Sequence, residues 1–471
     1  MRGYRQRFQN GFDEQGLWVE VEVEKELGLK TKRDIENLVK NDPNRSIAKF
    51  IDLCRKRVLK FSHIQTEQSK RLGYFMDWDA SYHTSSEENN YMIWYFLKKC
   101  FERGLIYKGL DSVPWCPRCG TAISQHEVLT EDYQELTHKA VYMRYPIVGR
   151  TNEFLLVWTT TPWTLPGNVA IAVNPELTYS KVKFGDAIYY IVKERILPAL
   201  GSQVEVMEEL QGDRLVSLLY SGPFDDLPAV DTAQRENPRV FHKTIAARDL
   251  VTSSEGTGLV HIAPDAGHED FILGRENKLP IIHLIDEFAN FLPGFGGISG
   301  GKTSDPGKIL EIAKNKGFLL KEEDFTHRYP VCWRCKSDLV FRAVDEWYIS
   351  MEPLRKSLME VSKAVCWIPE WGLERELDWL RNMDDWLISK KRYWGLALPI
   401  WECGIGDGSC GAFVVIGGRD ELKTRAIEGW NKFSGHTPHK PWIDEIKIRC
   451  ENCGELMTRI PDVGNPWLDA G

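Results

Sequence analysis

The sequence predicts an α/β protein in which a core of mixed helices and strands is interrupted by an inserted β-rich domain. Two observations predict this class: the residue pattern changes twice along the chain, and two close pairs of cysteines flank the stretch between the changes. Because 42% of the 471 residues are hydrophobic, the chain holds enough apolar side chains for two or three packed cores. We therefore expect three consecutive parts, residues 1–136, 137–326 and 327–471.

The first part, residues 1–136, has mainly helical patterns. Its stretches SIAKFIDLCRKRVLKF and NNYMIWYFLKKCFERGLIY carry apolar residues at helical spacing among lysines and glutamates. One segment, VEVEVEKELGL at 19–29, alternates as a strand does, while its glutamate and leucine content is typical of a helix. We predict a helix for that segment.

The middle part, residues 137–326, changes to short β-branched and aromatic runs such as EFLLVWTTT, NVAIAV and AIYYIV, which Gly, Pro and Asn turns separate. This pattern predicts the β-rich inserted domain. Residues 327–471 return to a mixed pattern, with a tryptophan-rich helical stretch at 370–395 and a cysteine-bearing module after it. The first and third parts are expected to form one core around the insertion.

Eight of the eleven cysteines fall into four close pairs, which favours metal binding over a disulfide framework in a chain of this length. Four thiolates complete a tetrahedral zinc site and leave no open position, so a bound zinc would be structural. Coincidence and redox chemistry are the alternative interpretations. The sequence predicts one or two Zn²⁺ ions, the first held by Cys116, Cys119, Cys332 and Cys335 and the second by Cys403, Cys410, Cys450 and Cys453.

Composition and charge limit the class of protein. A net charge of −8 provides no general attraction to nucleic acid or anionic lipid, so any such contact must come from local patches. No apolar run reaches the roughly 18 to 20 residues that span a bilayer, and the first ten residues lack the apolar stretch of a secretion signal. We expect a soluble, cytoplasmic protein with no membrane partner.

Three stretches together resemble the isoleucyl-tRNA synthetases, a class I family: WTTTPWTLPGN at 158–168, GTGLVHIAPDAGHEDF at 256–271 and RYWGLALPIW at 392–401. The threonine-rich stretch is the most specific, because valyl and leucyl relatives carry a TTRP-type sequence where this chain has TTTP. The resemblance extends over essentially the whole chain. It implies a Rossmann-like class I synthetase core, incomplete here, that an editing domain interrupts and that zinc knuckles accompany.

The resemblance assigns the first two stretches to an editing pocket, which hydrolyses the ester bond between a wrongly attached amino acid and the tRNA. Such a pocket is needed because a hydrophobic site discriminates weakly against a substrate one methylene smaller. The resemblance implies that Asp270 binds the ammonium of the wrong amino acid and that His261 excludes isoleucine by size. The other residues implied to contact the terminal ribose, a water or the amino acid are Thr159, Thr160, Thr161, Trp163, Thr164, Leu165 and Asn168.

The residue types alone permit plainer interpretations of the same positions. Threonines after an apolar run also end strands and cap helices, and a single histidine on a strand is commonly a hydrogen-bonded core residue. The sequence has no evident Ser/His/Asp arrangement, so we expect attack by a bound water without a covalent enzyme intermediate.

Two further segments resemble parts of the family's synthetic site. NGFDEQGLWVE at 10–20 resembles the element G-W-D-x-H-G-L-P-x-E, which implies that Asp13 holds the ammonium of the amino acid. In this chain Phe12, Gln15 and Trp18 replace the usual Trp, His and Pro. NPWLDAG at 465–471 resembles V-W-F-D-S-G, which implies that Trp467 contacts the isoleucine side chain.

The activity that the resemblance implies is ATP-dependent charging of tRNA(Ile) with isoleucine, together with hydrolytic editing of valyl-tRNA(Ile). Isoleucine and ATP with Mg²⁺ are the implied small substrates, tRNA(Ile) is the implied partner, and we expect a monomer. The family's His-Ile-Gly-His and Lys-Met-Ser-Lys-Ser motifs do not occur in the sequence, nor do its anticodon-binding helices. We therefore expect an internal fragment that does not activate isoleucine by itself.

Three other functions stay open on the sequence alone: a valyl or leucyl synthetase, a trans-editing aminoacyl-tRNA hydrolase, and a non-catalytic, zinc-stabilised RNA-binding protein. A TTRP sequence at 159–162 would favour the first. A hydrolase alone has no use for Asp13 and Trp467, and a non-catalytic protein has none for His261 and Asp270 beside the threonine stretch.

Overall fold

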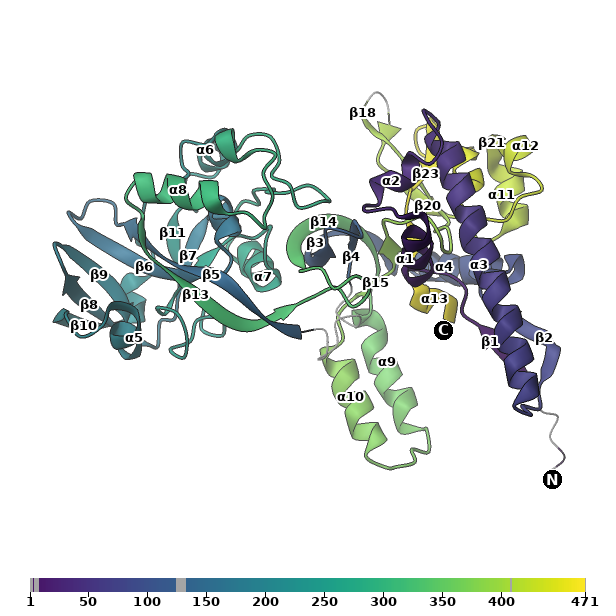
Figure 1. Cartoon of the computed structure of the whole chain (residues 1–471), viewed down its shortest axis with the longest axis horizontal. Coiled ribbons are helices and arrows are strands. Elements are labelled where there is room, and N and C mark those ends of the chain that lie inside the picture. The colour runs from purple at the N-terminus through teal and green to yellow at the C-terminus, as the bar shows by residue number, and fades with distance from the viewer. Residues whose placement is uncertain (1–2, 4–7, 124–132, 407–408, 471) are drawn as a thin grey trace. The chain divides into compact units, whose positions relative to one another are not determined.

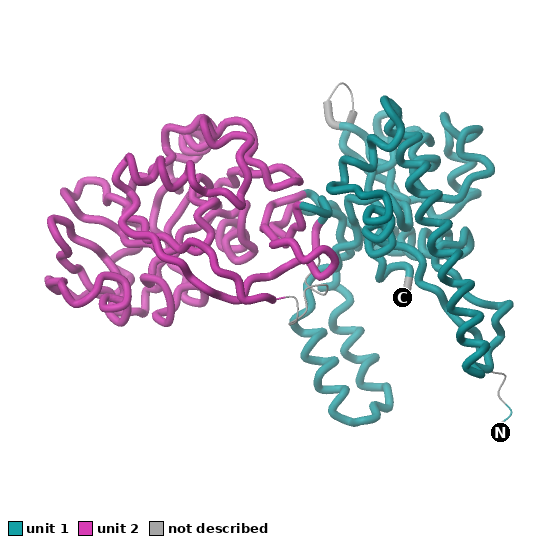
Figure 2. The backbone as a smooth tube through the Cα atoms, viewed as in Figure 1, with its two compact units in different colours: residues 1–109, 118–121, 345–471 teal, residues 110–117, 122–344 magenta. Residues whose placement is uncertain are grey.

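The computed structural model describes residues 3, 8–123, 133–406 and 409–470. The chain divides into two compact units: unit 1 comprises residues 1–109, 118–121 and 345–471, and unit 2 comprises residues 110–117 and 122–344 (Figure 2). Within the described ranges, no helix is both long enough and apolar enough to cross a lipid bilayer.

The units correct the expected boundaries at 136/137 and 326/327, because both boundaries fall inside unit 2. The physical reason is a long antiparallel pair of strands. β5 (Tyr133–Pro146) and β13 (Leu319–Pro330) pair from Tyr133 opposite Pro330 to Met143 opposite Leu319. Their ladder of hydrogen bonds runs across the expected boundaries, so the segments on both sides of each boundary belong to the same sheet.

Unit 2 is built on two sheets, as the β-rich pattern predicts (Figure 1). The larger sheet has the strand order β10-β8-β9-β6-β5-β13, in which β10 is Glu205–Gln211, β8 is Thr178–Phe184, β9 is Ala187–Val192 and β6 is Glu153–Thr159. The smaller has the order β11-β7-β12, with β11 at Lys243–Ala246, β7 at Ala170–Val173 and β12 at Leu259–Ile262. Among the described residues of this unit, the α-helices are α5 (Ile196–Leu200), α6 (Pro228–Glu236), α7 (His268–Glu276) and α8 (Gly307–Asn315).

The helices at the beginning of unit 1 confirm the helical prediction. α1 (Leu17–Leu27) covers most of the ambiguous segment at 19–29 and ends at Gly28, whose φ of 69° is the left-handed conformation typical of a glycine after a helix. α2 is Arg33–Glu36, α3 is Pro43–Arg71 and α4 is Glu87–Glu102. Asp42 and Ser86 cap α3 and α4 by accepting hydrogen bonds from backbone amides of the first turn.

Unit 1 also contains small sheets. Its five-stranded sheet has the order β20-β17-β23-β22-β21, formed by Phe413–Val415, Ile400–Cys403, Leu456–Arg459, Lys447–Arg449 and Ala426–Glu428. β1 (Gln9–Phe12) and β2 (Asp77–His83) pair in parallel, and β16 (Ser389–Lys390) pairs with β24 (Val463–Gly464). The Rossmann-like core that the resemblance implies stays a prediction.

Two long strands carry the chain from one unit to the other. β3 (Ile106–Cys116) and β14 (Val340–Ile349) each contain a point where the chain passes from one unit to the other. They are the central strands of a sheet of order β15-β14-β3-β4, with β15 at Trp386–Leu387 and β4 at Thr121–Ala122. β18 (Ile405–Gly406) and β19 (Ser409–Cys410) form a further two-stranded sheet.

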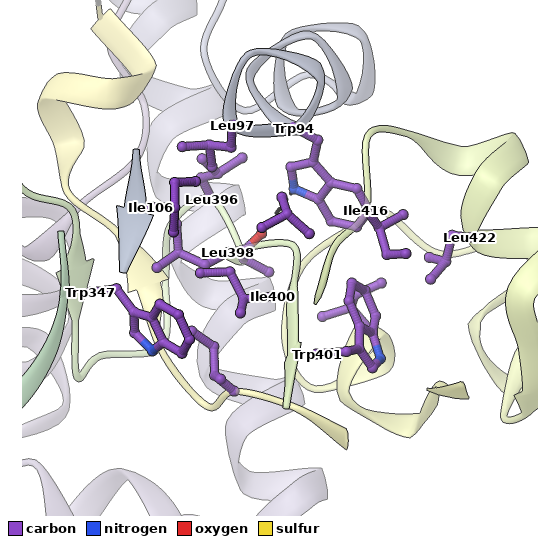
Figure 3. Close-up of a cluster of buried hydrophobic side chains, with 14 of the residues drawn as sticks. Trp94, Leu97, Ile106, Trp347, Leu396, Leu398, Ile400, Trp401, Ile416 and Leu422 are labelled. Atoms are coloured by element: carbon purple, nitrogen blue, oxygen red, sulfur yellow. Dashed lines mark hydrogen bonds between the residues drawn. The ribbon is translucent and has the colours of Figure 1, made fainter. Parts of the chain in front are cut away.

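The core of unit 1 joins α4 to the strands of the five-stranded sheet (Figure 3). Trp94 and Leu97 of α4 pack in one cluster with Leu398, Ile400 and Trp401. The indole nitrogen of Trp94 donates a hydrogen bond of 2.9 Å to the carbonyl of Ala397, so burial of this ring leaves no unpaired donor. The remaining helices of the unit are α9 (Glu352–Lys363), α10 (Gly372–Asn382), α11 (Arg419–Arg425), α12 (Trp430–Phe433) and α13 (Pro466–Ala470).

Candidate functional sites

The threonine loop, residues 159–168, begins where β6 ends. Thr159 is the last residue of β6, and Pro162–Gly167 form a short 3₁₀ helix. The hydroxyl of Thr159 accepts a hydrogen bond of 3.2 Å from the backbone amide of Thr161 and lies 3.2 Å from the Thr161 hydroxyl. Thr159 is buried, whereas Thr160 and Thr161 keep part of their surface exposed. The second and third threonines are therefore the ones that a ligand can reach.

The other predicted residues of the threonine loop point away from solvent. Trp163, Thr164, Leu165 and Asn168 are all buried, and Leu165 keeps only 1% of its surface exposed. Thr164 continues the turn by donating its hydroxyl to the carbonyl of Thr161 at 2.8 Å. Of these four side chains, Thr164 and Asn168 carry the polar contacts to the facing strand.

That facing strand is β12, and its contact residue is His261. The Nε2 atom of His261 lies 2.7 Å from the Thr164 hydroxyl oxygen, and its Nδ1 atom lies 3.4 Å from the Asn168 amide nitrogen. His261 is opposite Ile171 in the antiparallel pair of β12 with β7. The structure therefore brings together the two stretches that the sequence analysis assigned to one pocket.

The surrounding hydrogen bonds determine which nitrogen of His261 carries the proton. Because the Thr164 hydroxyl already donates to a carbonyl, it accepts from Nε2–H of His261. The Asn168 amide oxygen accepts from the Tyr220 hydroxyl at 2.8 Å, so its NH₂ group faces Nδ1 of His261 and donates to it. Burial lowers the pKa of His261 to about 4, and the ring is therefore neutral and fully bonded near pH 7. It has no free nitrogen with which to act as a general base.

Asp270 lies in the first turn of α7, close to the end of β12. Its Oδ2 atom accepts a hydrogen bond of 2.8 Å from the backbone amide of Ala263, the residue that follows β12. Burial, assisted by the neighbouring Glu269, raises the pKa of Asp270 to about 7, although the side chain keeps part of its surface exposed. A desolvated carboxyl with an accessible edge is suited to pairing with an ammonium ion, which would favour its charged form.

The Asp13 loop, residues 13–16, lies beside a cavity of about 520 Å³ in unit 1. Burial, and secondarily the charge of Glu14, raises the pKa of Asp13, whose carboxylate also accepts from the backbone amide of Gln15. The residues that line the cavity are Gly11, Phe12, Asp13, Glu14, Trp18, Val19, Arg57, Val58, Phe61, Ser62 and Gln65.

The structure places the second synthetic motif next to this loop. A Cβ atom on Gly16 would lie 2.7 Å from Cγ of Pro466, so a glycine is required there. Burial raises the pKa of Asp469, and the charge of Asp13 raises it further. Trp467 is 59% exposed, and the contact with an isoleucine side chain that the resemblance implies stays a prediction.

A buried arginine network joins α1 to the RYWG stretch, and the sequence analysis did not find it. Arg392 donates from Nε to Glu20 at 2.7 Å, from Nη1 to the carbonyl of Cys119 at 2.6 Å, and from Nη2 to Glu24. The carboxylate of Glu20 also accepts hydrogen bonds from the backbone amides of Tyr393 and Trp394. The one available signal was the four-residue spacing of Glu20 and Glu24 on a predicted helix, which puts two carboxylates on one face.

Both predicted cysteine sets come together in the structure. Within each set, all four sulfur atoms lie within 4.8 Å of one another. Sulfur pairs such as Cys403 with Cys453 at 3.5 Å and Cys410 with Cys450 at 3.6 Å approach the separation of about 3.8 Å that a tetrahedral zinc with bonds of about 2.3 Å requires. The donor sets therefore fit structural Zn²⁺.

Comparison with known proteins gives matches along the whole chain. The family model "tRNA synthetases class I (I, L, M and V)" matches residues 1–471. Similar curated proteins are the isoleucine–tRNA ligases of Methanopyrus kandleri (39% identity), Sulfolobus acidocaldarius (36%) and Pyrococcus horikoshii (39%). Each match covers 100% of this chain but only 44%, 43% and 45% of the relative, respectively. The chain thus spans less than half the length of these relatives.

Two solved structures also match, with low TM-scores. A LeuRS–tRNA–LeuAMS ternary complex from Agrobacterium radiobacter K84 has a TM-score of 0.31 and 16% identity, covering 100% of this chain and 51% of that chain. A GlLeuRS-CP1 structure has a TM-score of 0.30 and 10% identity, covering 39% of this chain and 98% of that chain.

Proposed function

Because the chain belongs to the class I tRNA synthetases of the isoleucyl, leucyl, methionyl and valyl group, we propose that it carries the editing site and part of the amino-acid site of an isoleucine–tRNA ligase. The observation that carries this proposal is the whole-chain similarity to proteins named isoleucine–tRNA ligase, at 36 to 39% identity. The sequence TTTP at 159–162, where valyl and leucyl relatives have TTRP, supports the same specificity.

The editing reaction that we propose is hydrolysis of valyl-tRNA(Ile). A water attacks the ester carbonyl, the bond between the carbonyl carbon and the ribose oxygen breaks, and the products are valine and tRNA with a free ribose hydroxyl. Asp270 binds the ammonium of the valyl group, and Thr160 and Thr161 bind the ribose and order the water. The neutral ring of His261, held by Thr164 and Asn168, limits the room for the side chain and so excludes isoleucine.

The amino-acid site in unit 1 serves the charging reaction in this proposal. Asp13 holds the ammonium of isoleucine and Trp467 contacts its side chain, with ATP and Mg²⁺ as co-substrates and tRNA(Ile) as acceptor. The proximity of Gly16 to Pro466 supports an amino-acid site, because it brings the segments at 10–20 and 465–471 together. A hydrolase alone would not need these two segments of the synthetic site. Zinc bound by the two cysteine sets would cross-link chain segments distant in sequence.

Hydrolysis of valyl-tRNA(Ile) and isoleucyl-tRNA(Ile) by the purified, zinc-loaded chain tests the proposal. We expect the valyl ester to be cleaved and the isoleucyl ester to be spared. Cleavage of isoleucyl-tRNA(Ile) at an equal rate would contradict the isoleucyl specificity.

A further inference from the structure

Gln15, which stands where the family motif has histidine, makes a buried contact with a histidine 424 positions later in the chain. Its amide nitrogen donates a hydrogen bond of 2.7 Å to the carbonyl of Thr84. The amide oxygen therefore faces Nε2 of His439, at 2.8 Å, and accepts from it. Gln15 has 0% of its surface exposed and His439 has 2%, so neither side chain can exchange this bond for one with water.

His439 is itself held on its other edge and on one face. Its Nδ1 atom lies 3.0 Å from the hydroxyl of Thr437, which can donate to it. The ring stacks on Trp394, with centroids 4.9 Å apart and an interplanar angle of 14°. Burial foremost, and the charge of Arg55, lower the pKa of His439 to about 3. The imidazole is therefore a neutral donor at Nε2 with a fixed orientation.

Two of the three contacts of His439, those with Trp394 and Gln15, lead to the Asp13 loop. The indole nitrogen of Trp394, on which the ring stacks, donates a hydrogen bond of 2.7 Å to the carbonyl of Glu14. The backbone amide of Gln15, whose side chain His439 holds, donates to the carboxylate of Asp13. Asp13 is only partly buried and keeps much of its surface exposed, so its position depends on the backbone that carries it.

We propose that His439 is a positioning residue for the ammonium site at Asp13: its bond to Gln15 and its stacking on Trp394 hold the backbone of residues 13–16. That Asp13 binds an ammonium rests on the proposed function. That His439 positions residues 13–16 rests only on its contacts with Gln15 and Trp394. His439 itself touches no substrate. Its effect on amino-acid binding passes through Gln15 and the amide that Gln15 offers to Asp13.

The test compares three variants of the chain by amide hydrogen exchange. His439→Phe keeps an aromatic ring on Trp394 and removes the Nε2–H donor, whereas His439→Gln restores a donor without the ring. The matched control is His436→Phe, because His436 lies in the same segment, is exposed and stacks on Trp442 at 4.7 Å and 6°.

We expect His439→Phe to raise the exchange rate of the Gln15 amide by about tenfold or more, because a buried bond that holds it is lost. His439→Gln should return the rate to within about threefold of the original, and His436→Phe should leave it unchanged. Equal rates in His439→Phe and His436→Phe would overturn the inference. So would a failure of His439→Gln to restore protection, since loss of packing alone would then explain the effect.

Binding of two small acids separates this inference from the proposed function. Isoleucine carries the ammonium that Asp13 would bind, and 2-hydroxy-3-methylpentanoate has a hydroxyl in its place. We expect His439→Phe to weaken binding of isoleucine and to leave binding of the hydroxy acid unchanged. If the chain binds neither acid, the assignment of Asp13 to an amino-acid site fails, while hydrogen exchange still decides whether His439 positions the loop.

Discussion

The Nε2 atom of His261 lies 2.7 Å from the hydroxyl oxygen of Thr164, although the two residues are 97 positions apart in the sequence. This bond joins β12 to the threonine loop. Because the Thr164 hydroxyl donates to the carbonyl of Thr161, the same bond also supports the turn that presents Thr160 and Thr161. This geometry makes His261 a neutral ring with a fixed orientation against the threonine loop.

Removal of the Thr164 hydroxyl should destabilise unit 2. Thr164→Val keeps the shape of the side chain and leaves Nε2–H of His261 buried without an acceptor, which costs about 1–3 kcal/mol of unfolding free energy. Urea denaturation measures the change. Thr160→Val is the matched control, because Thr160 is partly exposed, and it should shift the free energy of unfolding by less than about 0.5 kcal/mol. Equal effects of the two substitutions would contradict the hydrogen-bond network.

Editing should depend on pH through Asp270. The pKa of this carboxyl is raised to about 7, so it is mainly protonated below that pH and binds an ammonium weakly. As pH rises through 7 the carboxylate forms, and kcat/KM for valyl-tRNA(Ile) should rise and then level off, since kcat/KM reports the free enzyme. Initial rates between pH 5.5 and 8 give the profile, with spontaneous ester hydrolysis subtracted. Asp270→Asn should be slow at every pH, and a variant that keeps the same inflection would show that another group titrates.

Substitution of Arg392 should lower the free energy of unfolding far more than substitution of a surface arginine. Arg392→Gln leaves Glu20 buried without its cation, while Glu24 keeps its second ion pair, with Arg118. Breaking a buried ion pair in this way costs about 3–5 kcal/mol. The matched control is Arg419→Gln, whose pair with Glu87 is exposed and should contribute about 0–1 kcal/mol. Chemical denaturation followed by tryptophan fluorescence compares them. A cost below about 1 kcal/mol for Arg392→Gln would mean that the network does not hold α1.

Metal analysis should find two zinc ions per chain. Each cysteine set has four sulfur atoms within 4.8 Å, which matches one structural Zn²⁺ per set. Cys332→Ser and Cys450→Ser should each remove one equivalent and leave the other in place. Elemental analysis after exhaustive dialysis measures the content, and Cys366→Ser, at an exposed cysteine outside both sets, is the control. A zinc content unchanged in Cys332→Ser would exclude the first site.

Local sequence patterns predicted the type of most elements, and the residues of the two candidate sites came from the family resemblance and stay a prediction. The segment at 19–29 shows their limit. Its alternation of valine and glutamate is compatible with either a strand or a helix. In the structure it is a helix whose buried carboxylates are paired with the distant Arg392. Periodicity carries no information about such a distant partner.

The same limit explains the other differences. The expected boundaries at 136/137 and 326/327 were wrong because the change in residue pattern does not mark the ends of β5 and β13, whose pairing extends past both. The role of His439 was missed because the segment HTPHKPW has no recognisable motif, and only the fold brings it to Gln15. His261 was found through the resemblance, but its neutral state depends on Asn168 and Tyr220, which the pattern around His261 does not reveal.

If Asp270 of unit 2 recognises the ammonium of a misattached amino acid, a substrate that lacks this ammonium should be cleaved more slowly. The measurement compares cleavage of valyl-tRNA(Ile) with cleavage of the 2-hydroxyisovaleryl ester of the same tRNA, for the original chain and for Asp270→Ala. We expect the original chain to cleave the valyl ester at least about tenfold faster, a difference of about 1.4 kcal/mol, and Asp270→Ala to cleave the two esters at equal rates. A preference for the valyl ester that persists in Asp270→Ala would show that another group recognises the ammonium.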